Sequence, residues 1–332
     1  MTLTRLYDVT LRDGNHALRH TPSSDFVTSY CERADKSGVW AVEVGHGNGL
    51  GASSYLVGKS AESDASLLKA ARESLKNAKL AVHSIPGFAT IKRDLIPAID
   101  IGVDIFRVAT HVSEADVSQK HIEFLANKDV AVHGVLMMSH MIDIKGLIKQ
   151  ANLMKSYGAS TVILMDSAGY FVPTDVTQRI SAIKQEIEIE VGFHAHNNLG
   201  LGVGNALSAI NEGASIIDGA SMGLGAGAVN AQLENIVAAG IRESSLKSNM
   251  DEFLYMSKLV EDSYPDKLPR TTSSSTQSGL AGVFSGYAPQ VRAISEELGL
   301  DTANLWREMA ARKLVAGQES MIREIAQDLM NL

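Results

Sequence analysis

Residues 130–165 read VAVHGVLMMSHMIDIKGLIKQANLMKSYGASTVILM, and this stretch contains one complete repeat of the pattern that decides the fold. The apolar run over 130–137 predicts a strand, and apolar residues at helical spacing over 145–157 predict an amphipathic helix. Gly158 then ends the helix before a second apolar run begins at Thr161. A strand, a helix and another strand in this order predict a unit with two parallel strands.

The same alternation recurs through the first 244 residues. Short apolar runs that predict strands cover 6–9, 40–44, 80–85, 105–109, 130–137, 161–165, 190–194 and 216–218. Segments with helical periodicity lie between them, for example 64–75, 114–126, 145–157 and 204–212. Eight such repeats predict an α/β fold in which the parallel strands close into a TIM (β/α)8 barrel.

An open, doubly wound sheet that binds a dinucleotide is the main alternative fold. Its glycine fingerprint would follow the first strand, but residues 10–20 read TLRDGNHALRH, with charged side chains in place of a phosphate-binding turn. A glycine-rich segment, GLGAG at 223–227, does follow the eighth strand. Barrels often bind anions at that position, and a tight turn between strand and helix is an equally good interpretation.

The alternation stops after about residue 244. Segments 250–262, 285–298 and 302–328 have the pattern of helices, and TTSSSTQS at 271–278 is polar enough to predict a connecting loop. We therefore expect a catalytic barrel domain over 1–244 and an appended helical region over 245–332.

The composition excludes several classes of protein. Of 332 residues, 45% are hydrophobic and 20% charged, and the net charge is −8 without a run of Lys or Arg, which argues against nucleic acid or an anionic membrane as partner. Cys31 is the one cysteine, so no intramolecular disulfide can form. The N-terminus lacks the features of a signal peptide, and no apolar run reaches about 18 residues. We expect a cytoplasmic protein that acts on small molecules.

The strongest local signal is Phe193-His194-Ala195-His196-Asn197, at the end of the seventh predicted strand. Residues two apart on a strand point to the same face, so both imidazoles can reach one ion. Functional side chains of barrels gather at the carboxyl ends of the strands, which favours metal binding over a structural coincidence.

A second polar cluster, DVTLRDGNH at 8–16, follows the first predicted strand. It crowds Asp13, Arg12 and His16 together, and the alternative is a solvated turn in which Asp13 caps the next helix. Asp13, His194 and His196 would form a two-histidine, one-carboxylate set for Mn²⁺, Mg²⁺, Co²⁺ or Fe²⁺ that leaves coordination positions open. A 2-oxo acid could fill two of them, with the metal acting as a Lewis acid on the adjacent enolate.

Other residues of the cluster suggest catalytic roles. Arg12, which is always charged, could stabilise the enolate oxygen, and His16, which titrates near neutrality, could carry the proton of a 4-hydroxyl group, unless it is structural. Ser167 follows the sixth strand and could donate to a substrate carboxylate, or it could belong to an ordinary turn. Segments 43–46 and 107–111 are as consistent with an interior layer of ion pairs as with substrate contacts. No predicted strand contains the lysine that a Schiff-base aldolase needs.

These motifs resemble those of the barrel lyases that include hydroxymethylglutaryl-CoA lyase and isopropylmalate synthase, which share DxTLRDG at strand one and HxH at strand seven. Here they read DVTLRDG and HAHNN. Within that group the chain is similar to the 4-hydroxy-2-oxovalerate aldolase family almost from end to end, through motifs that read TLRDGNHALRH, GHGNGLGASS, RVATHVSEADV, LMMSHM, MDSAG, HAHNNLGLGVGNA, GLGAGAVNAQLE and ARKLVAGQESMI.

The resemblance implies a Mn²⁺-preferring enzyme that cleaves 4-hydroxy-2-oxo acids into pyruvate and an aldehyde, as in the catabolism of aromatic hydrocarbons. It implies Asp13, His194 and His196 as ligands, Arg12 at the enolate, His16 as acid and base, and Ser167 at the pyruvate end. It also implies an acylating aldehyde dehydrogenase as a partner of the helical tail and leaves the oligomeric state open.

The chain departs from the family pattern at three places. The apolar run before the proline of strand three is here His83-Ser84-Ile85-Pro86, so the resemblance puts His83 and Ile85 at the aldehyde end and suggests a hydroxylated or anionic aldehyde. The family tyrosine of the AGVYSS segment is Phe284, and either Tyr287 replaces it or its role is lost. Asn197 stands where the family has a third histidine.

Two alternatives to an aldolase stay open at this point. A Claisen-type condensing enzyme that joins an acyl-CoA and a 2-oxo acid would use a similar metal site. A non-catalytic barrel that serves as a subunit of a dehydrogenase complex would need none of the reactive side chains, although Arg12 and His16 are both present.

Overall fold

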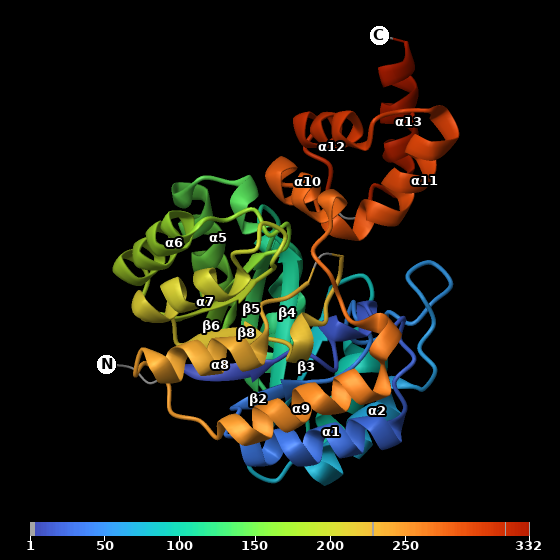
Figure 1. Cartoon of the computed structure of the whole chain (residues 1–332). Helices are drawn as coiled ribbons and strands as arrows, with labels where there is room; N and C mark the ends of the chain where they lie inside the picture. Colours follow the sequence, from blue (N-terminus) through green and yellow to red (C-terminus); the bar gives the residue numbers. More distant parts are fainter. Residues whose placement is uncertain (1–3, 228, 316, 332) are drawn as a thin grey trace.

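The computed structural model describes residues 4–227, 229–315 and 317–331, and its centre is a closed barrel of eight parallel strands (Figure 1). Each strand pairs with its neighbour in the sequence, and β8 closes the ring by pairing with β1. The strands are β1 (Arg5–Asp8), β2 (Ala41–Glu43), β3 (Lys79–Ser84), β4 (Ile105–His111), β5 (Ala131–Met137), β6 (Thr161–Asp166), β7 (Glu190–Ala195) and β8 (Ile216–Gly219). The predicted TIM barrel is confirmed, and the doubly wound alternative is wrong.

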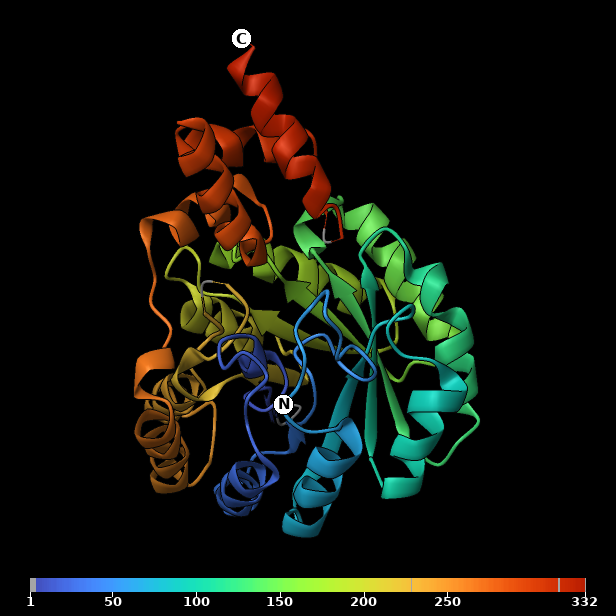
Figure 2. The ribbon, with the colours of Figure 1, turned by 90° about the vertical axis from the view of Figure 1, so that its right-hand side faces the viewer.

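Helices surround the barrel, and Figure 2 shows them packed outside the strands. They are α1 (Ser24–Ser37), α2 (Asp64–Ser74), α3 (Ile96–Ile101), α4 (Gln119–Ala126), α5 (Ile144–Tyr157), α6 (Pro173–Glu186), α7 (Gly202–Asn211), α8 (Leu233–Arg242) and α9 (Met250–Ser263). The strands are buried on both faces, so they read as almost continuous apolar runs. The helices instead alternate apolar and polar residues, because only one face of each meets the barrel.

Local signals define where the helices begin and end. Asp143 caps α5 by accepting a hydrogen bond from the Gly146 N–H, and Ser63 does the same for α2. Gly158 ends α5 with φ of 115°, a left-handed conformation that suits glycine. These caps explain why the sequence pattern located the repeat at 130–165 almost to the residue.

The tail has its own hydrophobic core. Four helices, α10 (Ser273–Ala281), α11 (Ala288–Leu298), α12 (Thr302–Ala311) and α13 (Glu319–Met330), form a lobe above the barrel (Figures 1 and 2). Trp306, which is 1% exposed, lies at the centre of a core that is separate from that of the barrel. Helix α9 packs on α1 and α8 instead. The division between residues 244 and 245 stays a prediction, and this packing associates α9 with the barrel.

Two expectations about the tail are wrong. Residues 273–281 form helix α10 and not a loop, because Thr272 and Ser275 make a reciprocal capping box at its start. The segment 302–328 is not one helix, because Lys313 and Gly317 adopt positive φ values of 54° and 94° between α12 and α13. Among the described residues, no helix is both long and apolar enough to cross a membrane.

Candidate metal centre

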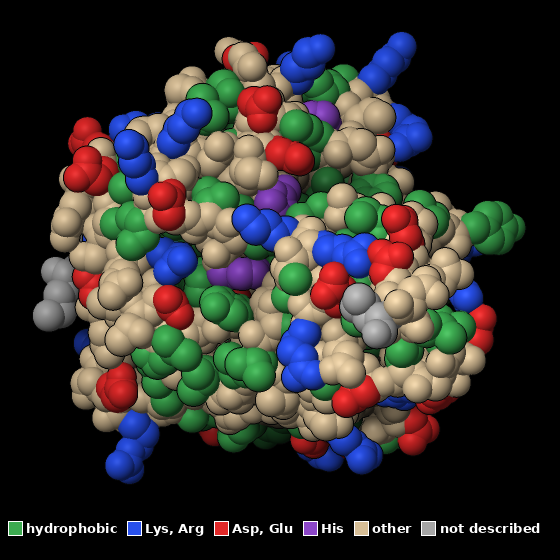
Figure 3. All heavy atoms as spheres, turned by 90° about the horizontal axis from the view of Figure 1, so that it is seen from above, with side chains coloured by type: hydrophobic (Ala, Val, Ile, Leu, Met, Phe, Trp, Pro, Cys, Tyr) green, Lys and Arg blue, Asp and Glu red, His purple; other side chains and the backbone are tan. Residues whose placement is uncertain are grey.

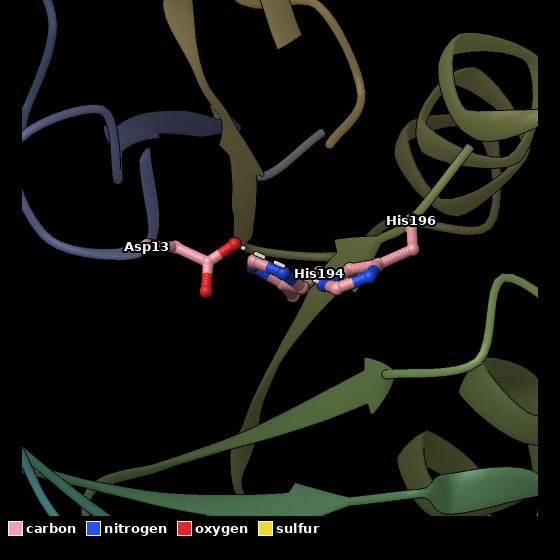
Figure 4. Close-up of side chains that lie close together, drawn as sticks. All are labelled: Asp13, His194 and His196. Carbon is pink, nitrogen blue, oxygen red and sulfur yellow. Dashed lines mark ion pairs between the residues drawn. The ribbon is translucent and has the colours of Figure 1, made fainter. Parts of the chain in front are cut away.

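Three buried side chains converge at the carboxyl ends of β1 and β7. Asp13 begins the short helix η1 (Asp13–His16) that follows β1, whereas His194 lies within β7 and His196 directly after it. One potential ligand atom from each of the three lies within 4.8 Å of the others, and Figure 4 shows the carboxylate and the two imidazoles pointing toward one another. The barrel therefore brings Asp13 close to His194, although these two residues are 181 positions apart in the chain (13 and 194).

The donor set fits a divalent cation. Asp218 of β8 accepts a hydrogen bond from Nδ1 of His194 at 2.9 Å, and Nε2 of the same ring is buried without a partner among residues 4–227, 229–315 and 317–331. Nδ1 of His196 is also buried and has no partner in the same residues, while its Nε2 lies 3.9 Å from Oδ2 of Asp13. Unpartnered buried nitrogens are costly unless they bind something, so this arrangement matches the two-histidine, one-carboxylate pattern of open metal sites.

Asp13 is held in its ionised form. Burial alone would raise its pKa, but the Arg12 guanidinium and the nearby His196 outweigh burial and hold the pKa well below its usual range. Oδ1 accepts from Nη1 of Arg12 at 2.8 Å, and Oδ2 accepts from Nδ2 of Asn230 at 2.6 Å. Asn230 pairs with His196 through a backbone bridge, and its own Oδ1 is buried and receives no hydrogen bond from a described residue. The sequence reasoning missed Asn230.

Arg12 is anchored by three groups and keeps one nitrogen free. Its Nε donates to Oε2 of Glu43 at 2.9 Å, and Nη1 donates to Asp13 and to the carbonyl of Gly47 at 3.2 Å. Nη2 is buried and has no hydrogen-bond partner in the part of the chain that the structure describes. A guanidinium that is fixed on one side and unsatisfied on the other is well arranged to receive a substrate oxygen.

An interior polar layer lies beneath this arginine, as one of the two interpretations of 43–46 and 107–111 expected. Arg107 makes two hydrogen bonds to Asp218, Nη1 to Oδ2 at 2.5 Å and Nη2 to Oδ1 at 2.8 Å, and its Cζ lies 3.3 Å from the centre of the Tyr7 ring. Glu43 lies beside this pair and contacts Arg12 and Tyr7. His83 belongs to the same layer, with Nδ1 3.6 Å from Oε1 of Glu43, and is 2% exposed.

His16 ends η1 next to the metal centre and is half-buried. Gly47 packs directly against its ring, since a Cβ at Gly47 would lie 2.5 Å from Nε2 of His16. Two further histidines, His20 and His46, stack on each other behind it with ring centres 3.7 Å apart. Desolvation lowers the pKa of His16 to about 4, and Asp13 only partly offsets this, so the expectation that this residue titrates near neutrality is wrong. The imidazole is instead neutral at pH 7 and has a free lone pair with which to accept a proton.

Ser167 follows β6 at the same end of the barrel and is 6% exposed. Its Oγ accepts from the N–H of Met138 at 3.0 Å, which leaves the hydroxyl proton free to donate. The turn after β6 is organised by Asp166 instead, whose carboxylate accepts from the N–H groups of Tyr170 and Phe171. The turn and a donating Ser167 are therefore compatible.

The glycine segment after β8 acts as a close-fitting turn. A Cβ at Gly225 would lie 2.5 Å from Nδ2 of Asn230 and 2.9 Å from Oδ2 of Asp13, and one at Gly227 would lie 2.1 Å from Oγ of Ser285. The absence of a Cβ at Gly225 and Gly227 thus lets this segment lie between the metal centre and the tail. Asn197, in place of the family histidine, accepts from the Gly202 N–H at the start of α7.

The residues proposed at the aldehyde end lie on two elements. His83 is in β3, and Ile85, which follows it, is half-buried. Phe284 is half-buried beside the turn η7 (Ser285–Tyr287). Tyr287 lies in the core of the tail at 1% exposure, and its hydroxyl donates to the carbonyl of Val315. The structure does not bring Tyr287 to the metal centre.

The remaining signals concern lysine and Asp218. The observed β3 begins one residue earlier than predicted, at Lys79, but this side chain is 52% exposed and pairs with Asp104 at the amino end of the strand. Among the described residues no strand lysine faces the barrel mouth. Asp218 falls in the strand predicted at 216–218 and has no predicted role there, although a carboxylate inside an apolar strand signals a buried partner.

Figure 3 views the molecule from the side of the tail and shows histidine side chains in the middle of this face. Between barrel and tail lies a cavity of about 190 Å³, lined by His140, Met141, Tyr170, Ala281, Gly282, Val283, Ala310, Lys313 and Leu314. Nε2 of His140 lies 2.8 Å from the carbonyl of Gly282, and Asn198 donates to Oγ of Ser278, so the tail is tied to the loops after β5 and β7.

Comparison with known proteins agrees with this architecture. Residues 4–260 match the family model described as HMGL-like, and residues 269–331 match the DmpG-like communication domain. A 4-hydroxy-2-oxovalerate aldolase of Spirochaeta aurantia is 47% identical over 97% of this chain and 95% of its own length. One from Pectobacterium atrosepticum is 46% identical over 98% and 95%. The carboxyl transferase domain of Rhizobium etli pyruvate carboxylase shares the fold, with a TM-score of 0.81 at 16% identity over 100% of this chain and 62% of that one.

Proposed function

Because the chain belongs to the 4-hydroxy-2-oxovalerate aldolase family of HMGL-like barrels, we propose that it catalyses the reversible retro-aldol cleavage of a 4-hydroxy-2-oxo acid to pyruvate and an aldehyde. The observation that carries this proposal is the convergence of Asp13, His194 and His196 beside the unsatisfied Nη2 of Arg12. A carbon–carbon lyase of this type needs a divalent cation and a fixed positive charge at one oxygen; the three converging side chains are suited to hold the first, and the guanidinium of Arg12 supplies the second.

The roles of the side chains follow from their contacts. Asp13, His194 and His196 would hold the divalent cation, which supplies Lewis-acid polarisation of the 2-oxo acid when it is bound. Arg12 donates through Nη2 to the oxygen that becomes the enolate, and Glu43 keeps the guanidinium in place.

Proton transfer and substrate orientation fall to two further residues. His16, neutral at pH 7, takes the proton of the 4-hydroxyl group as the C3–C4 bond breaks and returns it in synthesis. Ser167 donates its free hydroxyl proton to the pyruvate carboxylate and so orients that end of the substrate.

For the cation we propose Mn²⁺, with Mg²⁺ or Co²⁺ able to replace it. Two imidazoles and one carboxylate with open positions suit these metals better than a closed, tetrahedral zinc site. The test is to prepare the metal-free protein, add back each ion separately, and compare both the dissociation constant and kcat. A protein that is most active with no added ion, or that ignores chelators, would contradict the proposal.

The aldehyde end is where this chain differs from its family. His83 replaces an apolar residue and lies in contact with Glu43, which favours an aldehyde with a hydroxyl or anionic group. Because the hydroxyl of Tyr287 is engaged by Val315, we propose that no tyrosine orients the aldehyde and that Phe284 and Ile85 contribute only apolar surface.

A screen of aldehydes with pyruvate and Mn²⁺ tests this specificity, with His83→Leu compared with wild type. The expected result is that wild type prefers hydroxylated or anionic aldehydes and that His83→Leu shifts the preference toward small apolar ones. Preference for apolar aldehydes in wild type, unchanged in the variant, would contradict it.

A single assay separates the aldolase from a condensing enzyme. Pyruvate release from a 4-hydroxy-2-oxo acid without any coenzyme A is expected, and it is followed by the oxidation of NADH through lactate dehydrogenase. Release of free thiol from acetyl-CoA in the presence of a 2-oxo acid, without aldol turnover, would assign the site to Claisen chemistry. The absence of both activities in the metal-loaded protein would support a non-catalytic subunit.

We also propose that the helical tail binds an acylating aldehyde dehydrogenase. The match of residues 269–331 to a communication domain supports this, and Leu280 on α10 is 75% exposed. Leu280→Asp should weaken copurification of a coexpressed dehydrogenase. Leu254→Asp is the matched control, because Leu254 is 51% exposed on α9, which packs against the barrel. Equal copurification with both variants would exclude this face of α10.

A further inference from the structure

Asp218 and Arg107 form a buried ion pair beneath the metal centre that the proposed reaction does not use directly. Asp218 is 1% exposed and Arg107 is fully buried. Both oxygens of the carboxylate bind the guanidinium, and Oδ2 also contacts Nδ1 of His194 at 2.9 Å. Burying two charges is expensive, so a pair at this position needs a reason beyond stability.

The hydrogen bond from His194 determines which nitrogen of the ring can bind a metal. An ionised carboxylate can only accept, so Nδ1 of His194 must carry the proton and Nε2 must present its lone pair. Nε2 is the buried nitrogen that has no hydrogen-bond partner among the described residues. Without the carboxylate, the neutral imidazole could place its proton on either nitrogen, and the form with Nε2–H cannot bind a cation.

Arg107 in turn fixes the carboxylate. The N–H edge of its planar guanidinium contacts both oxygens, and its Cζ lies over the ring of Tyr7. The carboxylate therefore cannot rotate away from His194, and its orientation is determined by residues of β1, β4 and β8 together.

We propose that Asp218, held in place by Arg107, is a positioning residue that orients His194 and restricts it to the tautomer that binds the metal, and thereby sets the affinity of the site for its cation. This inference rests on the proposed metal site. It adds to the site a residue that lies deeper in the barrel than the ligands. Replacement of the hydrogen-bond partner of a metal-bound histidine commonly weakens metal affinity by about 10- to 100-fold.

The first test measures Mn²⁺ binding directly, by competition with a chelating dye. Asp218→Asn should bind Mn²⁺ about 10- to 100-fold more weakly than wild type, and its kcat should recover to within a few-fold at saturating Mn²⁺. Failure of wild type to bind a divalent cation would overturn the proposed function itself. Binding by wild type together with unchanged affinity in Asp218→Asn would overturn only the present inference.

The second test asks whether Asp218 acts through His194. In a double-mutant cycle, Asp218→Asn should change the Mn²⁺ affinity of His194→Ala by less than about twofold, because the group that it positions is already absent. Additive losses would mean that Asp218 has a general structural effect on the site and would contradict the inference.

Two further variants test whether misfolding, and not the loss of positioning, explains a lower Mn²⁺ affinity. Asp218→Asn leaves Arg107 without its partner, so Arg107→Leu/Asp218→Asn removes both charges, which is commonly tolerated. The double variant should fold and still bind Mn²⁺ weakly, and wild-type affinity in it would refute the proposal. Asp8→Asn is the matched control, because Asp8 is a fully buried strand carboxylate whose partners are Thr10 and Tyr30. It should leave the Mn²⁺ affinity unchanged.

Discussion

Replacing Arg12 with lysine tests the central electrostatic feature of the site. The guanidinium reaches Glu43, Asp13 and the Gly47 carbonyl through Nε and Nη1, and it retains Nη2 for substrate. A lysine ammonium is a compact charge and cannot hold these anchors while also donating to the enolate oxygen. It does keep a positive charge beside the two buried carboxylates, so the fold should persist.

The expected loss comes from one donor at the enolate oxygen. Removal of such a donor costs about 3 kcal/mol of transition-state stabilisation, which corresponds to a decrease in kcat of about 10² to 10³. Arg12→Ala should lower both kcat and stability. It also leaves Glu43 buried without its cation, which costs about 3–5 kcal/mol of folding free energy.

Three measurements on Arg12→Lys test the proposed role of Nη2. Pyruvate release at saturating Mn²⁺ gives kcat, competition with a chelating dye gives the metal affinity, and urea unfolding gives the stability. We expect kcat to fall by at least about a hundredfold while the metal affinity and the stability stay close to wild type. A kcat within threefold of wild type would refute the role of Nη2, and loss of the metal would show that Arg12 acts by holding Asp13.

Three further predictions concern the base, the glycine turn and the tail. His16→Ala should slow cleavage by about 10² to 10⁴ at unchanged Mn²⁺ affinity, and an unchanged rate would assign the proton to another group. Gly225→Ala should weaken Mn²⁺ binding by about 1–3 kcal/mol, because the added methyl would lie 2.9 Å from Oδ2 of Asp13. Gly204→Ala is the control and should leave Mn²⁺ binding unchanged, because a Cβ there would have no described atom within 4 Å. Trp306→Ala should destabilise the tail by about 3–5 kcal/mol, seen as earlier proteolysis there, while the barrel keeps its activity in the free enzyme; simultaneous loss of the barrel would show one cooperative unit.

Much of the fold was readable from the sequence because its signals are local. A strand buried on both faces must be apolar along its length, and a helix on a barrel must be apolar on one side, so the pattern at 130–165 predicted β5, α5 and β6. The prediction of a loop at 271–278 was wrong because it also relied on a local signal, the composition of the segment. Its serines and threonines favour loops and turns on average, but the cap between Thr272 and Ser275 and the packing of α10 on α12 decide in favour of a helix.

The chain by itself determined which chemical groups are present at the barrel mouth, because the carboxyl ends of all parallel strands of a closed barrel meet at the same edge. Asp13, Arg12, His16, His194 and His196 could be named from this rule alone. Only the tertiary structure decided how each group is oriented, since the partners of a side chain come from strands that are far away in the sequence. The hydrogen bond from His194 to Asp218 and the contact of Arg107 with Tyr7 depend on packing across the barrel, and the burial of Tyr287 depends on packing within the tail. No local pattern encodes these contacts.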